Sequence, residues 1–569
     1  MFRMNRRMIV ALLSVVSLVA LIAPSALAQE RTVLNVNWGT EPPTLDSSRA
    51  SDTTSLTIIE ALNVNLGRTN EITGLTEPGM ATWTIEETDT SLIFTFDIME
   101  GVPWVRYNAE TGAVEQVLDE NGEPRMVKAQ DFAYAMLRTL DPATASDYAY
   151  VLMEAIKGGV AYNTSEATGE ELQALRDAVG ITVVDDYTLQ IETPEKVPFY
   201  LDIVAGMWFG IAQPSWVIEE YGDFWTEPEN IQTYGPYALE YWYHDDSLGL
   251  IANPFWPGTE TVPQPAIPQI MGVMLTDASA AFANYEAGTL DVVGAPLSEM
   301  DRIKADPVLS EELHIGPSFC TYYYGFNVTK PPVDNVHLRR ALSAAVDRQA
   351  LIDNVTKGEQ EPARWFSRPG LVAAPTMETH PNIGIGYDPA MAKEELAQAL
   401  ADLGVADANE LPPITLMYNE STGHARIAEA IQQMWLNELG VNVQLATQEW
   451  GVFLETLDTD PPQIWRLGWC NDYFDADNFA RGVFRSDAGN NNTRWGNPEF
   501  DRLVDEARRL SDVTERTELY AQAENILVYE DAAIIPLYWY TSVEMTKPYV
   551  NRTYALTGHQ RYEKWSFAE

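Results

Sequence analysis

The segment 468–479, GWCNDYFDADNF, holds the side chains best suited to chemistry in this sequence. Cys470 is one of only two cysteines, and Asp472, Asp475 and Asp477 follow it closely. Such residues could bind a metal ion, provide a reactive thiol, anchor a disulfide or form an ordinary acidic turn. The spacing does not match a calcium-binding loop, because no glycine or terminal glutamate falls at the required offsets. A zinc site is poorly supported, since the chain lacks a CxxC pair and no histidine directly adjoins either cysteine.

Motifs of enzymatic catalysis are missing from the rest of the sequence. The six histidines form no HExxH motif, and GxSxG, GxGxxG and Walker-type phosphate-binding patterns do not occur. The chain has 83 acidic residues, so any single pair of carboxylates is weak support for acid–base catalysis. We therefore predict a protein that is not an enzyme and that uses no metal ion or other cofactor.

The first 28 residues are typical of an export signal. Three arginines precede an apolar run, and a small-x-small pattern ends at Ala28, where we expect cleavage. A membrane anchor is less favoured because the apolar run is short. No cysteine follows the run, so a bacterial lipoprotein is not expected. Since pairs of cysteines are usually oxidised outside the cytoplasm, Cys320 and Cys470 are predicted to form a disulfide.

The composition is that of an acidic chain with enough hydrophobic residues to form buried cores. The formal net charge of −47 argues against nucleic acid and anionic lipid as partners. With 46% hydrophobic residues in 569 positions, the chain can bury several cores. Its length predicts more than one domain, or two lobes built from separated segments.

The elements that must position the acidic segment alternate between strands and helices. Period-two alternation predicts strands, and apolar residues at helical spacing predict helices. Mixed α/β lobes follow from this order. The polar segment 107–125 is predicted to be a surface loop. In the N-terminal half, strands are predicted in 31–38 and 92–105, a helix in 127–140 and a hairpin around Asp185 and Asp186. A strand–helix–strand unit is predicted in 267–294, with its helix starting at Asp277. Further strand–helix pairs are predicted in 320–355 and 414–450.

Several segments together resemble one protein family. These segments are CTYYYGFNVTKPPVDNVHLRRALSAAVDR (320–348), MYNESTGHARIA (417–428), GVNVQLATQEWGVFL (440–454), RLGWCNDY (466–473) and 515–540. They resemble the extracytoplasmic solute-binding proteins of peptide-importing ABC transporters, family 5. The paired CTYYY and GWCxDY motifs are similar to the oligopeptide-binding branch in particular, and the resemblance covers essentially the whole mature chain.

The resemblance implies an α/β fold of the periplasmic-binding-protein type. We expect a class II two-lobed clamp with an additional domain, in which helices flank mixed β-sheets. The implied division is a signal peptide in 1–28, lobe I in 29–75, 184–319 and 541–569, additional domain II in 76–183, and lobe III in 320–540.

The resemblance also implies a function. A member of this family would be a monomeric extracytoplasmic receptor that encloses an extended oligopeptide between closing lobes and delivers it to membrane permease subunits. An oligosaccharide receptor on the same fold is the main alternative, because some relatives bind cello-oligosaccharides. A secreted hydrolase is a third class. No nucleic acid partner is expected.

Roles for individual residues follow from the same resemblance. Asp472 would pair with the α-amino group of the peptide, because a buried ammonium needs a counter-charge. The backbone beside Gly468 and Trp469 would bond the first residues of the peptide. Arg466 and His424 would receive the carboxylates of peptides of different lengths.

The remaining family positions are expected to shape the pocket. Asn419, Trp450 and Tyr323 match pocket-lining residues, and Cys320 is expected to pair with Cys470 beside Asp472. Asp475 and Asp477 are interpreted as residues of a solvated turn. Thr356 stands where the family has a lysine for peptide carboxylates, with Lys357 displaced by one position, which puts the corresponding peptide length in doubt.

Overall fold

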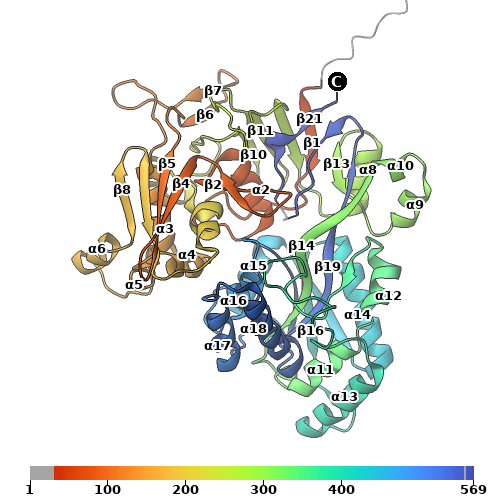
Figure 1. Ribbon diagram of the computed structural model, residues 1–569. Coiled ribbons are helices and arrows are strands. Elements are labelled where there is room, and N and C mark those ends of the chain that lie inside the picture. The colour runs from red at the N-terminus through yellow and green to blue at the C-terminus, as the bar shows by residue number, and fades with distance from the viewer. Residues whose placement is uncertain (1–30, 557–558, 569) are drawn as a thin grey trace, which may run out of the picture.

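The computed structural model describes residues 31–556 and 559–568 (Figure 1). The predicted export signal, residues 1–28, lies outside the described residues. None of the helices in the described ranges combines the length and the apolar character needed to cross a bilayer.

One sheet of eleven strands extends through both lobes of the clamp. Five strands on one side form lobe I, three on the other side form lobe III, and two long strands join them (Figure 1). The order is β10 (Tyr237–Tyr243), β11 (Ser247–Ala252), β12 (Gln269–Val273), β1 (Val33–Asn37), β13 (Val292–Gly294), β19 (Ile534–Thr546), β14 (Leu313–Phe326), β18 (Ile464–Cys470), β16 (Ile414–Asn419) and β17 (Val443–Gln448), and β15 (Glu361–Pro362) pairs with β19.

The strands β14 and β19 carry the chain between the two lobes. One end of β19 pairs with β13 in lobe I, and the far end of β14 pairs with β18 in lobe III. The register of the two strands shifts between Pro317 and Thr321, where the ladder is interrupted. The expected boundaries at residues 319 and 540 fall inside these strands, and we propose that the hinge lies here. The predicted two-lobed α/β clamp is confirmed.

The additional domain has its own antiparallel sheet, which lies beside lobe I (Figure 1). The sheet order is β4 (Ala81–Glu87), β5 (Leu92–Ile98), β9 (Thr188–Glu192) and β8 (Ile181–Asp185). The predicted hairpin of β8 and β9 is present, but its two strands pair across the expected boundary at residue 183. We therefore propose that this domain extends at least to the end of β9.

Small two-stranded sheets and helices complete the chain. The segment 107–125 is not only loop, because part of it forms a hairpin that begins at Val105. The small sheets pair β2 (Gly67–Thr69) with β3 (Thr76–Pro78), β6 (Val105–Asn108) with β7 (Ala113–Gln116), and β20 (Val550–Asn551) with β21 (Ser566–Phe567). Helices of lobe I and the additional domain are α2 (Thr53–Leu62), α3 (Ala129–Leu140), α4 (Ala149–Ala155), α5 (Gly159–Asn163), α6 (Glu170–Asp177), α7 (Ser215–Tyr221), α8 (Ala278–Glu286), α9 (Met300–Ala305) and α10 (Leu309–Glu312).

Lobe III is covered by helices whose ends follow ordinary capping rules. In α14, the Ser421 side chain accepts the backbone N–H of His424, and the helix stops at Gly440, which has a φ of +69°. Ile427, Ile431 and Trp435 recur at helical spacing and are buried against the sheet. The helices of this lobe are α11 (Val336–Ala344), α12 (Arg348–Leu351), α13 (Pro389–Leu403), α14 (Thr422–Leu439), α15 (Trp450–Thr459), α16 (Ala476–Phe484), α17 (Pro498–Ala507) and α18 (Val513–Asn525).

The predicted disulfide is confirmed. Cys320 on β14 and Cys470 on β18 are directly opposite in the strand register, with their Cα atoms 4.0 Å apart and their sulfurs bonded. The crosslink therefore joins the two strands at the place where β18 ends and the acidic segment begins.

Candidate ligand-binding site

A cavity of about 280 Å³ lies where the three parts of the fold meet. Lobe I contributes the start of α2, the additional domain contributes Asp147 and Tyr148, and lobe III contributes most of β18. Five of the eight predicted ligand-binding residues line this cavity. They are Asp472, Trp469, Gly468, Arg466 and Trp450.

The wall formed by β18 has an open backbone edge. One side of β18 pairs with β14 along its whole length, but the other side pairs with β16 only at Ile464 and Trp465. No other strand of the described chain pairs with the edge that follows. An exposed strand edge can bind an extended peptide as an additional strand. Gly468 leaves room for the neighbouring side chains, since a Cβ there would lie 3.1 Å from the Tyr540 hydroxyl oxygen and 3.4 Å from Nη2 of Arg466.

The Asp472 carboxylate lies at the end of this open edge. Its Oδ2 accepts a hydrogen bond of 2.8 Å from Nδ2 of Asn478, and its backbone N–H donates to Oδ1 of the same residue at 3.1 Å. Burial raises the pKa of Asp472 to about 7, although Asn478, His559 and the Tyr148 hydroxyl each act to lower it. No lysine or arginine of the described residues pairs with this carboxylate. An incoming cation would therefore stabilise its charged form.

Asn478 is a neighbour of Asp472 and Trp469 that the sequence did not reveal. Besides its two bonds to Asp472, its Oδ1 accepts the indole N–H of Trp469 at 3.0 Å. The Trp469 ring in turn stacks on Tyr148 of the additional domain, with ring centroids 6.4 Å apart and an interplanar angle of 11°. Asn478 lies in the first half of α16, so the start of this helix orients both the carboxylate and the aromatic wall.

Arg466 is a buried cation without an acidic partner. Its Nη1 donates to Oδ1 of Asn419 at 3.1 Å and its Nη2 donates to the Tyr540 hydroxyl at 2.6 Å, while the guanidinium lies 4.5 Å from the centre of the Tyr322 ring. Its Nε has no hydrogen-bond partner. No carboxylate of the described residues pairs with Arg466. Because an uncompensated buried charge is costly, the site is suited to an anionic group of a ligand.

The predicted residue His424 faces a second cavity. This cavity has a volume of about 960 Å³, and Tyr540 lines both cavities. Nδ1 of His424 lies 3.2 Å from the Tyr322 hydroxyl. Burial, together with the nearby charge of Arg466, holds the pKa of His424 well below its usual range. At neutral pH it would meet a carboxylate as a neutral hydrogen-bond donor, not as a cation.

Thr356 itself offers no cation in place of the family lysine, although Arg426 also lines the second cavity. The Thr356 side chain lines the second cavity and donates a hydrogen bond to Gln360 at 2.8 Å. The adjacent Lys357 is paired with Asp301 instead. Among the described residues, no group of three or more histidine, cysteine or acidic side chains is arranged as a metal site.

Tyr323 does not lie where it was expected. Its side chain is 0% exposed and packs in the hydrophobic core against the rings of Phe366, Trp465 and Phe484. Successive residues of a strand point to opposite faces, so Tyr323 points away from the face on which Tyr322 contacts Arg466. Neither cavity is lined by Tyr323.

The interpretation of Asp475 and Asp477 as a solvated turn is wrong. Both are buried, and Asp475 pairs with Arg516 at 2.5 Å. The Asp477 carboxylate accepts hydrogen bonds of 2.8 Å from the hydroxyls of Tyr473 and Tyr520. These bonds fix the start of α16, whose N-cap is Asp475, and through Asn478 the positions of Asp472 and Trp469.

The fold and the cavity together define a ligand-binding clamp, and comparison with known proteins identifies its family. Residues 76–491 match the bacterial extracellular solute-binding proteins, family 5 (middle region). The chain belongs to this family. It is 34% identical over 519 residues to the oligopeptide-binding protein OppA of Bacillus subtilis, covering 90% of this chain and 88% of the relative. It is 30% identical to the periplasmic oligopeptide-binding protein OppA of Salmonella typhimurium, covering 94% and 93%.

Solved structures of similar proteins have the same fold, and two structures of one of them differ in how closely they match this protein. The murein tripeptide binding protein MppA of Escherichia coli is similar with a TM-score of 0.81 and 26% identity, over 95% of this chain and 99% of that one. The unliganded open form of MppA is similar with a TM-score of only 0.60, at the same identity and over 95% and 98% of the chains. The lower score shows that this protein is less similar overall to that open form than to the other MppA structure.

Proposed function

We propose that this protein is an extracytoplasmic receptor that binds oligopeptides in an extended form and delivers them to the permease of an ABC importer. One observation carries the proposal. One cavity wall is an unpaired strand edge with Asp472 at one end and Arg466 at the other, and within the described ranges Asp472 has no lysine or arginine partner and Arg466 has no acidic partner.

This arrangement matches the chemistry of a short peptide. Six positions separate Arg466 from Asp472, so their Cα atoms are at most about 20 Å apart. An extended peptide of three to five residues is about 10–17 Å long by the same rise, and it carries one positive and one negative end. Its backbone could bond the open edge of β18, which would not discriminate between side chains.

The named relatives support the same assignment. The two relatives with 34% and 30% identity are both oligopeptide-binding proteins, and the second is periplasmic. We further propose that residues 1–28 direct export and are removed, that the mature protein is not a lipoprotein, and that it acts as a monomer without catalysis or cofactor. His424 and Trp450 are proposed to contact longer or bulkier peptides.

The test is calorimetric titration of the mature protein with alanine tri-, tetra- and pentapeptides and, separately, with cello-oligosaccharides. We expect saturable binding of peptides and none of sugars. Binding of the sugars alone would assign the fold to an oligosaccharide receptor instead. Mass spectrometry of the ligand after incubation should return it intact, because a hydrolase would shorten it.

A further inference from the structure

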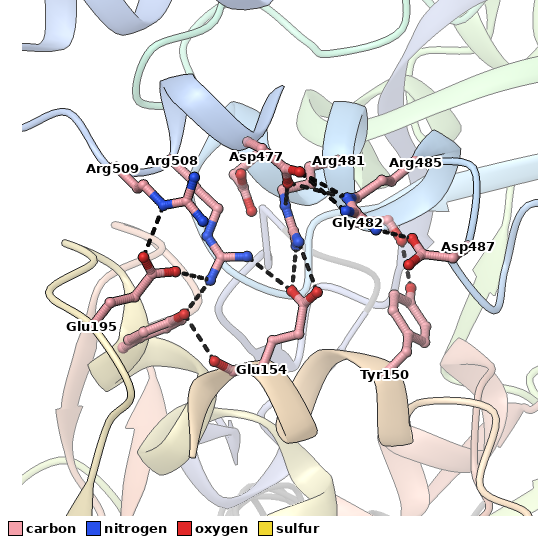
Figure 2. Close-up of polar contacts among 12 residues, drawn as sticks. Tyr150, Glu154, Glu195, Asp477, Arg481, Gly482, Arg485, Asp487, Arg508 and Arg509 are labelled. Atoms are coloured by element: carbon pink, nitrogen blue, oxygen red, sulfur yellow. Dashed lines mark hydrogen bonds and ion pairs between the residues drawn. The ribbon is translucent and has the colours of Figure 1, made fainter. Parts of the chain in front are cut away.

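A network of ion pairs joins the additional domain to lobe III (Figure 2). The additional domain is continuous in sequence with lobe I on both sides, whereas its contacts with lobe III are non-covalent. If the lobes separate at β14 and β19, these contacts must break. The network comprises Tyr150 and Glu154 of the additional domain, together with Glu195 and Tyr200 of the segment that follows β9, on one side, and Arg481, Gly482, Arg485, Asp505, Arg508 and Arg509 of lobe III on the other.

Glu154, at the end of α4, is the centre of this network. Its carboxylate lies 2.6 Å from Nη1 of Arg481 and 2.9 Å from Nη1 of Arg508 (Figure 2). The two arginine side chains are only 11% and 6% exposed, so the pairs are largely shielded from water. Burial alone would raise the pKa of Glu154, but the two arginines hold it below its ordinary value. The carboxylate therefore bridges two cations of lobe III.

Neighbouring contacts strengthen the same junction. Glu195 bridges Arg508 and Arg509, each at 2.8 Å. The Tyr150 hydroxyl donates a hydrogen bond of 2.5 Å to the backbone carbonyl of Gly482. The partners in lobe III lie in α16 or just after the end of α17, and the bonds join two parts of the clamp.

The helix α16 connects this junction to the ligand site. Arg481 and Gly482 follow Asn478 by three and four positions, which places them one helical turn further along. Asn478 holds Asp472, while Tyr148, just before α4, stacks on Trp469. The two helices that carry the interdomain pairs therefore also adjoin the cavity, because Tyr148 directly precedes α4 and Asn478 of α16 bonds to Asp472 and Trp469.

We propose that Glu154 is a positioning residue for ligand binding, because its pairs with Arg481 and Arg508 hold the additional domain against lobe III and so keep Tyr148 over the ligand site. This inference rests on the proposed function. Glu154 does not line the ligand cavity, so it should affect affinity through the closure of the clamp and not through contact with any particular ligand. Every peptide should then lose affinity by the same factor when the pair is removed.

The test compares Glu154→Gln with a matched control, Glu192→Gln. Glu192 pairs at 2.8 Å with Lys157 inside the additional domain and does not touch lobe III. Dissociation constants and dissociation rates are measured for trialanine and pentaalanine at low and at moderate salt. Glu154→Gln should raise both dissociation constants by the same factor, about 10- to 100-fold, mainly through faster dissociation. The control should bind as the parent protein does.

The salt dependence of peptide affinity distinguishes the loss of an ion pair that holds the clamp closed from general damage to the structure. The affinity of the parent protein should fall as salt rises, and this dependence should be shallower in Glu154→Gln, because one charged junction is already lost. Unchanged dissociation constants in Glu154→Gln, or a loss confined to one of the two peptides, would overturn the proposal. If the parent binds no peptide, the proposed function fails. In that case small-angle scattering of the two ligand-free proteins tests the inference. Glu154→Gln should have a larger radius of gyration than the parent protein, and equal radii would refute the role of Glu154.

Discussion

Peptide affinity should depend on pH in a way that reports the ionisation of Asp472. The site needs a carboxylate to pair with an ammonium, but burial raises the pKa of Asp472 in the ligand-free protein to about 7. The α-amino group of a peptide has a pKa of about 8. Binding should therefore be tightest near pH 7.5, where about three quarters of each group is in its charged form.

The magnitude follows from the fraction of charged groups. At pH 5.5 only about 3% of a carboxyl group with a pKa of 7 is ionised, so affinity should be about 20-fold weaker than at pH 7.5. Because the pKa of Asp472 is raised, its carboxylate becomes protonated as the pH falls through that pKa, and the affinity for the peptide is lost over the same range. At pH 6, binding should also release about 0.9 proton, because the amine is already protonated and Asp472 must lose its proton.

Calorimetry in two buffers with different ionisation enthalpies measures this proton release directly. Asp472→Asn is the control, because the other titratable groups of the cavity remain in it, namely Asp52, Asp147, Asp458 and His559. Burial raises the pKa of Asp458 to about 6, so its contribution must be subtracted. Affinity that stays constant from pH 5.5 to 7.5 in the parent protein, with no proton released, would refute the reasoning.

Three further predictions concern single contacts. Asp475→Asn should destabilise the fold by about 3–5 kcal/mol in denaturant unfolding, since it leaves the buried Arg516 unpaired; a loss within 0.5 kcal/mol would contradict that pairing. Arg466→Gln should weaken trialanine binding at least about 10-fold but hardly change binding of trialanine amide, and equal losses would exclude a carboxylate contact. Thiol counting under denaturing conditions should find neither Cys320 nor Cys470 free, and reduction should lower the melting temperature; two reactive thiols would defeat the disulfide.

Local patterns in the sequence predicted much of the fold correctly. The apolar spacing in 127–140 corresponds to α3, and the helix expected from Asp277 is α8, where the Asp277 side chain caps the backbone N–H of Ala280 at 2.8 Å. Such features depend on residues a few positions apart. The resemblance then named Asp472 and Arg466, and the strand pairing places these two residues at the ends of the open edge of β18.

Contacts between distant segments explain what the sequence did not reveal. Asp475 and Asp477 look like a solvated turn because their partners, Arg516 and Tyr520, lie on α18, about forty positions later. Tyr323 looks like a pocket residue until the strand register shows which face it occupies. Sequence order alone does not bring together residues that become neighbours only when α16 packs against α18 and β14 pairs with β18.

The central claim is that Asp472 binds the free amine of a peptide, and a double-mutant cycle tests it most directly. The cycle measures the affinity of the parent protein and of Asp472→Asn for trialanine and for N-acetyl-trialanine. Each single change should cost about 3–5 kcal/mol, or 2–4 decades of affinity, because it leaves one charge buried and unpaired. The two changes together should cost little more than either alone, since they remove the same interaction. If Asp472→Asn binds trialanine as tightly as the parent protein does, the claim is contradicted.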